Sequence, residues 1–330
     1  MKLLLSLFLA MLPAWCMSQS AIEKKFSYIS PTDSLPVKIR SGKTMVILEV
    51  PGNNPKEWDR VSRSAHATMT KGGIDPVVYY DIDILFSGTD ITRSFYEDLS
   101  RREIDNIVLI DYKAEKSRIA ALPFSADFFQ DTIQRAWFRE GEFKNIADQL
   151  YVRTANSGLE LSNLLLAELP EIGPLTTTIT GRRAEFFNLS MSAGKMAVPK
   201  FKDPLKDQEL QAALDLAFDY DFELVDPALS DEELDKMGFL FVLKSASGPV
   251  REVRKLLDYE EEEDVTGYVT IRYTGDQSQA VTLSLRDNIF KYYVYHIKSN
   301  TTYLGTEWDG DLGWRQALLN HLRSIKKWVN

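Results

Sequence analysis

The stretch MVILEVPGNNPKEWDRVSRSAHATMTKGG, residues 45–73, decides the fold. Its first six residues, Met45 to Val50, are apolar apart from one glutamate, which predicts a buried strand. Asn54 is a good N-cap and Pro55 suits the first helical position, and the apolar residues that follow recur with helical spacing until two glycines. A buried strand followed directly by an amphipathic helix is the building block of α/β proteins.

The same pattern continues along the first half of the chain. Asp75 to Tyr80 reads as a second strand, Ile91, Phe95 and Leu99 form a helical stripe, and Ile107 to Ile110 reads as a third strand. Strands that alternate with helices imply a largely parallel sheet with right-handed crossovers. The first half is therefore predicted to contain a β-α-β-α-β unit.

The second half shows the same order of elements, so we predict a duplication of the unit. The predicted elements are a strand at Lys195 to Lys200, a helix opened by Asp203-Pro204, a strand at Asp221 to Val225, a helix with a capping box from Ser230 to Glu233, and a strand at Phe239 to Leu243. The predicted fold class is α/β, with two tandem β-α-β-α-β units and mixed sheets.

Each half is expected to end in α+β fashion, with β-hairpin strands and a closing helix. The predicted elements are hairpin strands at 268–273 and 280–285, a strand at 290–296, and closing helices at 157–169 and 311–327. The resulting domain prediction is a signal peptide at 1–20, a lead-in segment at 21–44, a first domain at 45–175 and a second domain at 176–330.

The N-terminus has the pattern of a secretory signal peptide. Leu3 to Leu12 is an apolar run that is long enough for a signal sequence and too short to cross a bilayer. Small residues allow a cut before Ala21 or before Gln19, and either cut removes Cys16. We therefore expect an exported, soluble mature protein, periplasmic or extracellular, with no transmembrane segment and no cysteine.

The charge balance makes nucleic acid an unfavourable partner. Removing Lys2 leaves 38 basic residues against 48 acidic ones, a net charge of −10. Binding to phosphate-rich partners needs a concentrated positive surface, which this composition does not favour.

One short motif resembles part of a phosphate-binding loop. Gly42, Lys43 and Thr44 match the Gly-Lys-Thr ending of a Walker A motif, but Val37 stands where its first glycine belongs. The motif also precedes a predicted strand, whereas a Walker A loop follows a strand and opens a helix. A nucleotide site at these three residues is therefore the alternative, and a loop that enters a strand is the favoured interpretation.

Histidines and carboxylates predict no catalytic, cofactor or metal site. His66, His296 and His321 lie on apolar patterns typical of packed side chains. Acidic residues cluster at Asp81, Asp83 and Asp90, at 260–264 and at 307–311, and none of these clusters has the spacing of a calcium loop. Paired carboxylates that converge only in the fold remain open as a hydrolase alternative.

Three aromatic residues near the C-terminus form a candidate partner surface. Tyr303, Trp308 and Trp314 lie close in sequence, and aromatic residues are frequent at binding hot spots. Core packing is the competing interpretation. The stretch around Gly305 and Gly310 carries turn signals before the last helix.

Segments in both halves resemble an uncharacterised family of exported proteins of Bacteroidota bacteria, some members of which are labelled NTPases. The resemblance is carried by residues 73–81, 230–243 and 303–309. More distantly, the order of strands and helices is similar to that of the small periplasmic α/β domains of the TolB N-terminal and CsgG types. The resemblance implies a role in envelope assembly and no specific site residue.

The sequence therefore supports three functional hypotheses. The first is a non-catalytic exported interaction or scaffold protein that binds an envelope protein partner. The second is a hydrolase, NTPase-like but without a complete Walker A motif. The third is a sugar- or peptide-binding module that uses the three C-terminal aromatic residues.

Overall fold

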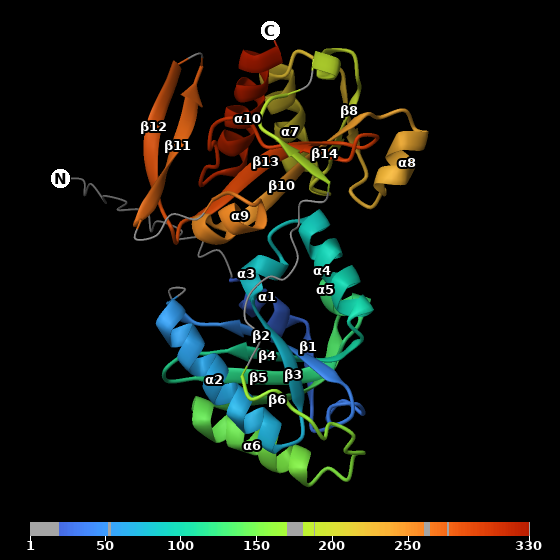
Figure 1. Cartoon of the computed structure of the whole chain (residues 1–330), viewed down its shortest axis with the longest axis vertical. Coiled ribbons are helices and arrows are strands. Elements are labelled where there is room, and N and C mark those ends of the chain that lie inside the picture. The colour runs from blue at the N-terminus through green and yellow to red at the C-terminus, as the bar shows by residue number, and fades with distance from the viewer. Residues whose placement is uncertain are drawn as a thin grey trace, which may run out of the picture.

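The computed structural model describes residues 20–51, 54–169, 181–187, 189–260, 265–275 and 277–329. It contains two α/β units, a first unit at residues 20–169 and a second unit at residues 181–329, stacked end to end (Figure 1). Each unit is built on a six-stranded mixed sheet. The α/β fold class with two repeated units is confirmed. The predicted signal peptide lies almost entirely outside the described residues, as does the acidic run at 261–264.

The first sheet has the strand order β1-β6-β5-β4-β2-β3. Its strands are β1 (Ile29–Thr32), β2 (Lys43–Glu49), β3 (Asp75–Asp81), β4 (Ile104–Asp111), β5 (Ser117–Pro123) and β6 (Gln134–Gly141). β3, β2 and β4 run parallel, whereas β5 is antiparallel to both of its neighbours. The three parallel strands are the ones predicted from the alternation of strands and helices.

Helices cover both faces of this sheet. They are α1 (Ala21–Ser27), α2 (Pro55–Lys71), α3 (Ile82–Leu85), α4 (Thr89–Arg101), α5 (Ala126–Phe129) and α6 (Phe143–Ala155). Val46 and Leu48 of β2 pack with α2 and α6, while Met45 and Ile47 face α1, α3 and α4. Because successive side chains of a strand point to opposite faces, the apolar run at 45–48 of this strand requires helices on both sides.

The second sheet repeats the first strand for strand, in the order β7-β14-β13-β10-β8-β9. Its strands are β7 (Arg182–Ala184), β8 (Met196–Pro199), β9 (Phe222–Val225), β10 (Phe241–Pro249), β13 (Asn288–His296) and β14 (Thr301–Tyr303). The parallel and antiparallel pairings also match those of the first sheet. Identical order and direction of six strands support the predicted duplication.

Three helices of the second unit, α7 (Pro204–Ala217), α8 (Asp231–Lys236) and α10 (Trp314–Val329), correspond in position to α2, α4 and α6 of the first. The second unit also contains α9 (Val250–Leu256) and a 3₁₀ turn η2 (Leu189–Ser192). α7 and α10 pack together as α2 and α6 do, and α8 lies between β9 and β10 as α4 lies between β3 and β4. Ser230 forms the predicted capping box with Glu233.

An insertion distinguishes the second unit from the first. The first unit joins β4 to β5 through residues 112–116, whereas the second joins β10 to β13 through residues 250–287. The insertion holds α9 and a hairpin of β11 (Gly267–Thr274) and β12 (Gln277–Ser284). Figure 1 shows the hairpin standing beside α10 and α9 at the junction with the first unit.

Two sequence-based expectations about the first unit need correction. The lead-in segment is not separate, because α1 packs in the first core and β1 pairs with β6 as the outer strand of the first sheet. The closing helix is α6 at Phe143–Ala155, not residues 157–169, which contain no helix. α6 ends at Ala155 with Asn156 as its C-cap, and the side-chain amide of Asn163 then donates to the carbonyls of Gly42 and Gly73.

One hydrophobic core continues through both units. Ile84 and Leu85 of α3 pack in the same cluster as Val250, Val253 and Leu256 of α9. A domain interface that is this apolar favours a fixed arrangement of the two units. The chain is therefore expected to behave as one body.

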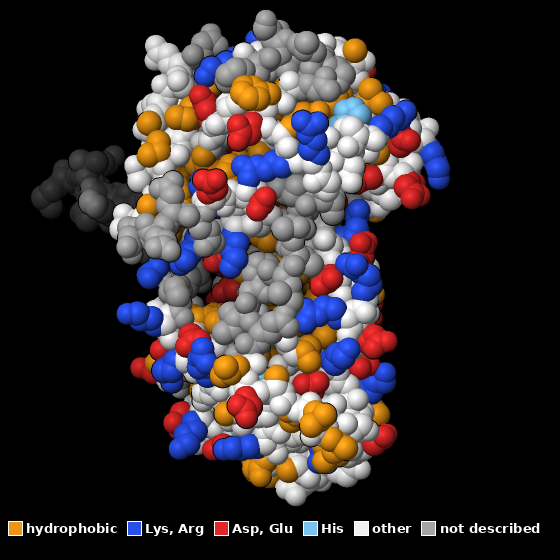
Figure 2. Space-filling model, viewed as in Figure 1, with side chains coloured by type: hydrophobic (Ala, Val, Ile, Leu, Met, Phe, Trp, Pro, Cys, Tyr) orange, Lys and Arg blue, Asp and Glu red, His pale blue; other side chains and the backbone are white. Residues whose placement is uncertain are grey.

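The outer surface carries mixed charges. On the face shown in Figure 2, basic and acidic side chains are interspersed over both units. In the parts of the chain that the structure describes, no helix has the length and hydropathy that a membrane crossing requires.

Candidate functional site

Carboxylates end the three parallel strands of the first unit. β2 ends at Glu49, β3 at Asp81 and β4 at Asp111, and Glu49 lies beside Asp111 in register. β2 comes first in this β-α-β-α-β unit, and β3 and β4 lie on opposite sides of it. Ligands of open α/β sheets bind outside the carboxyl ends of the strands at such a switch point.

The environment of these carboxyl groups is strongly perturbed. Burial, together with the carboxylates of Asp83 and Asp111, raises the pKa of Glu49 to about 7. Burial and the carboxylate of Asp83 likewise raise the pKa of Asp81 to about 8. Asp111 is buried and paired with Arg118 at 2.5 Å and Lys113 at 3.3 Å. Both pKa values lie near neutral pH, where a general acid or base works best.

The cluster is covered by the chain itself. The hydroxyl of Ser20 and the N–H of Ile22 donate hydrogen bonds to Glu49, and α9 brings Glu252 near Asp81. Asp81 uses one carboxylate oxygen to cap α3, accepting a hydrogen bond of 2.9 Å from Asp83 N. Within the described ranges, no three His, Cys, Asp or Glu side chains are placed to hold a metal ion.

The matching crevice of the second unit is also closed. β8 ends at Pro199 beside β10, and a cavity of about 60 Å³ remains there. The cavity is lined by Leu243 and Tyr292 from the second unit, and by Thr89 and Asp90 at the start of α4 from the first. It has room for a few water molecules, whereas sites for small organic ligands are several times larger.

An ion pair holds the start of α4 against the carboxyl edge of the second sheet. Lys244 of β10 is nearly buried and lies 3.1 Å from Asp231 and 3.6 Å from Asp90. Its ammonium group also lies over the ring of Tyr295 at 4.3 Å. Lys244 therefore links both units at the place where the second unit would otherwise be open.

A second group of buried ionisable residues lies inside the second unit. Asp309 is fully buried, with Lys291 Nζ at 2.6 Å from one carboxylate oxygen and His321 Nδ1 at 3.0 Å from the other. Burial lowers the pKa of both Lys291 and His321, while those two side chains hold the pKa of Asp309 below its usual value despite its own burial. Because all three side chains are fully buried, this cluster is part of the core and is not open to a substrate.

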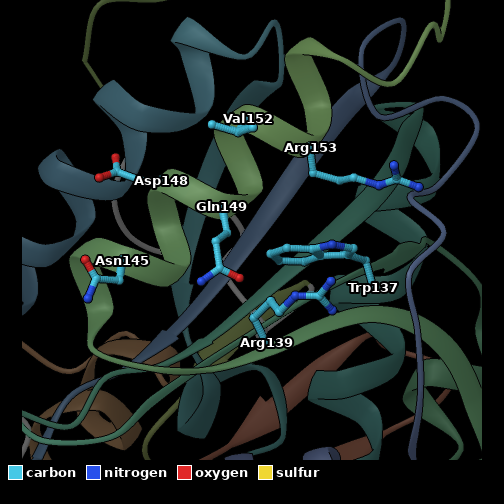
Figure 3. A pocket seen from close by; sticks show the side chains of 7 residues that line it. All are labelled: Trp137, Arg139, Asn145, Asp148, Gln149, Val152 and Arg153. Atoms are coloured by element: carbon cyan, nitrogen blue, oxygen red, sulfur yellow. The ribbon is translucent and has the colours of Figure 1, made fainter.

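The outer side of the first unit carries an open recess between β6 and α6. Its volume is about 580 Å³, and its lining residues are Trp137, Arg139, Asn145, Asp148, Gln149, Val152 and Arg153. In Figure 3, Gln149 and Arg153 point from α6 toward the indole of Trp137 and the guanidinium of Arg139.

Asp33 accepts hydrogen bonds from both arginines that line the recess. Arg139 lies over the indole ring at 5.2 Å and donates to an Asp33 carboxylate oxygen at 2.6 Å, and Arg153 Nε donates to the Asp33 carbonyl at 3.2 Å. The remaining N–H groups of Arg153 and the amide of Gln149 face the recess. Such donors suit carbonyl or carboxylate oxygens of an extended protein segment.

The Gly-Lys-Thr motif lies at the opposite end of the sheet from the switch point. β2 begins at Lys43, whose ammonium group donates to the carbonyl of Arg102 at 2.9 Å. Thr44 is fully buried, and a side chain at Gly42 would collide with Asp105. The motif enters a strand, which was the favoured interpretation from sequence.

The three C-terminal aromatic residues do not form an exposed surface. Tyr303 and Trp308 are buried in different cores, and Trp314 is half-buried against Phe201 at a ring distance of 4.9 Å. The prediction of a partner surface at these residues is therefore wrong, and the competing interpretation, core packing, holds. The side chains fill the space under the hairpin and α10.

Comparison of the chain with family models, curated proteins and solved structures finds no match. The resemblance to exported Bacteroidota proteins stays a prediction.

Proposed function

We propose that the protein is exported and acts as a non-catalytic interaction or scaffold protein of the bacterial envelope. The observation that carries this proposal is the closure of both switch-point crevices by the chain itself. α1 and α9 lie over the carboxyl edge of the first sheet, and the start of α4 closes that of the second. With both crevices closed, the protein would bind a partner through its outer surface.

The recess on α6 is the surface best suited to a protein partner. It is open, combines an aliphatic side chain with two guanidinium groups above the buried indole of Trp137, and lies on the end of the first unit distant from the second. We propose that it receives an extended segment of an envelope protein, with Arg153 and Gln149 donating hydrogen bonds to it.

Site-specific photo-crosslinking in intact cells tests this proposal. A photoreactive residue at Gln149 should give one crosslinked product, which Arg153→Glu should weaken at least tenfold. The matched control is the same probe at Leu216 on α7, which is 63 % exposed. Equal products from both positions, or products that ignore Arg153→Glu, would contradict partner binding in the recess.

A hydrolase is the second candidate, favoured by the raised pKa values of Glu49 and Asp81 at a switch point. In this case the two carboxyl groups would act as general acid and base on a substrate admitted by displacement of α1. Hydrolysis of a nucleotide, glycoside or peptidoglycan fragment that is lost in both Glu49→Gln and Asp81→Asn would establish it. Activity that survives both changes would exclude this site.

A further inference from the structure

Helix α1 is held firmly at its C-terminal end. Lys25 is buried and donates to the carbonyl of Phe128 at 2.7 Å and to Asp131 at 2.5 Å. Lys24 lies 2.5 Å from the same aspartate. Basic residues in the last turn also suit the helix dipole. The positive charges at the C-terminal end of α1 are therefore paired with the carboxylate of Asp131.

The N-terminal end of α1 faces negative charge. Ile22 is fully buried in the first core, and its N–H and the hydroxyl of Ser20 both donate to Glu49. The other carboxylate oxygen of Glu49, Oε2, is buried and has no hydrogen-bond partner within the described residues. Ala21 lies between the two residues that contact Glu49, so a group placed on its nitrogen would be next to this carboxylate.

The neighbouring charges do not neutralise Glu49. Asp83 of α3 and Asp111 of β4 add negative charge to its environment, and Glu252 of α9 adds more near Asp81. Two cations of this region are already paired, since Arg118 binds Asp111, and Lys113 binds Glu23 at 3.1 Å and Asp111 at 3.3 Å. Among the described residues, the groups that shift the pKa of Glu49 include two acidic neighbours and no basic one.

We propose that removal of the leader before Ala21 places the α-ammonium group of the mature chain against Glu49, and that this ion pair holds α1 on the carboxyl edge of the first sheet. The inference rests on the export proposed above. Processing thereby adds an ion pair to the core contacts that already hold α1 in place.

The chemistry of an α-amino group fits this position. Its ordinary pKa is near 8, so it is charged at neutral pH and offers three donors. The cut removes Ser20, and with it the hydroxyl that caps α1 and contacts Glu49, so the ammonium group takes over the lost hydrogen bond. A positive charge at a helix N-terminus opposes the helix dipole, and the carboxylates supply the compensation.

The test begins with chain exported from cells and purified in its processed form. Its intact mass identifies the first residue, and the proposal requires Ala21. A chain that begins at Gln19 overturns the proposal and leaves export intact, whereas a chain that keeps its leader contradicts export itself.

The rate at which the α-amine is acylated then tests whether it is paired with Glu49. The amine of the wild-type chain should react at least tenfold more slowly than that of Glu49→Gln, and the pKa from the pH dependence of labelling should lie above 8. Glu103→Gln is the matched control, because Glu103 is an exposed glutamate near Lys43, and it should behave as wild type. Equal rates in wild type and Glu49→Gln overturn the proposal.

A second variant keeps Glu49 in place in case Glu49→Gln fails to fold. One additional serine before Ala21 moves the amine away from the carboxylate. This chain should label at the fast rate, whereas its unfolding temperature is not diagnostic, because the added serine restores the N-cap of α1 that Ser20 provides. Labelling as slow as in wild type would overturn the proposal. Photo-crosslinking at Gln149 reports on partner binding separately from both variants.

Discussion

Gly88 of the first unit lies directly against the backbone carbonyl of Ser245 in the second. A Cβ atom built on Gly88 would be 2.4 Å from that oxygen, which is closer than any ordinary contact. Next to it, Ser247 N donates a hydrogen bond to the carbonyl of Ser87. The backbones of the two units thus meet where α4 begins and β10 passes.

The first prediction concerns this contact. Gly88→Ala should lower the free energy of unfolding by about 1–3 kcal/mol, because the methyl group must push the two backbones apart. Gly313→Ala is the control, since a Cβ there meets nothing within 4 Å. Urea unfolding measures both, and equal stability of the two variants would show that the units are not in fixed contact at Gly88.

The second prediction concerns the buried Asp309. Asp309→Ala leaves Lys291 and His321 without their common carboxylate and should cost about 3–5 kcal/mol of unfolding free energy. The double change Lys291→Met with Asp309→Leu should cost less than Asp309→Ala, because it leaves no buried charge unpaired. Denaturant midpoints compare the variants. A double variant that is less stable than Asp309→Ala would contradict the electrostatic explanation.

The third prediction is a pH dependence from Asp81. The folded protein holds a proton on Asp81 up to about pH 8, whereas an unfolded chain releases it near pH 4, so the stability from this group falls as pH rises between the two values. Asp81→Asn keeps the acceptor that caps α3 and removes the titration. It should therefore gain stability relative to wild type as pH increases.

Asp81 titrates together with Glu49, so we expect the unfolding free energy to change with pH at about half the slope of an isolated group. The resulting difference between variant and wild type should grow by roughly 2 kcal/mol between about pH 5 and pH 8. Unfolding in denaturant at several pH values measures the difference between variant and wild type. A difference that does not change with pH would show that Asp81 is ionised throughout.

Much of the fold was accessible from sequence because local signals agreed with the final structure. The apolar run ending at Glu49, the cap at Asn54 and the capping box at Ser230 each predicted an element that formed. Residues 157–169 were predicted as a helix because they hold the place of the last helix of the second half, yet Leu164 and Leu165 are exposed. Apolar content without a helical stripe does not define a helix.

The candidate sites were harder to predict because they depend on long-range packing. His321 meets Lys291 and Asp309 across 30 and 12 residues, and no local spacing indicates that contact. The carboxylates Glu49 and Asp81 were recognisable from sequence, since each lies within one residue of the end of a predicted strand and ends the observed one. Comparing the last residues of neighbouring strands would have brought them together.

The most direct measurement of the central claim, that the chain closes its own crevices, is a thermal-unfolding screen of the processed protein. The panel holds nucleotides with magnesium, calcium, sugars and peptidoglycan fragments. A ligand at one hundred times its dissociation constant stabilises a protein by about 2.7 kcal/mol, which shifts the midpoint by roughly 5 °C or more. The account predicts no shift with any of these small ligands. A clear shift that disappears in Glu49→Gln would contradict it and establish the first crevice as a ligand site.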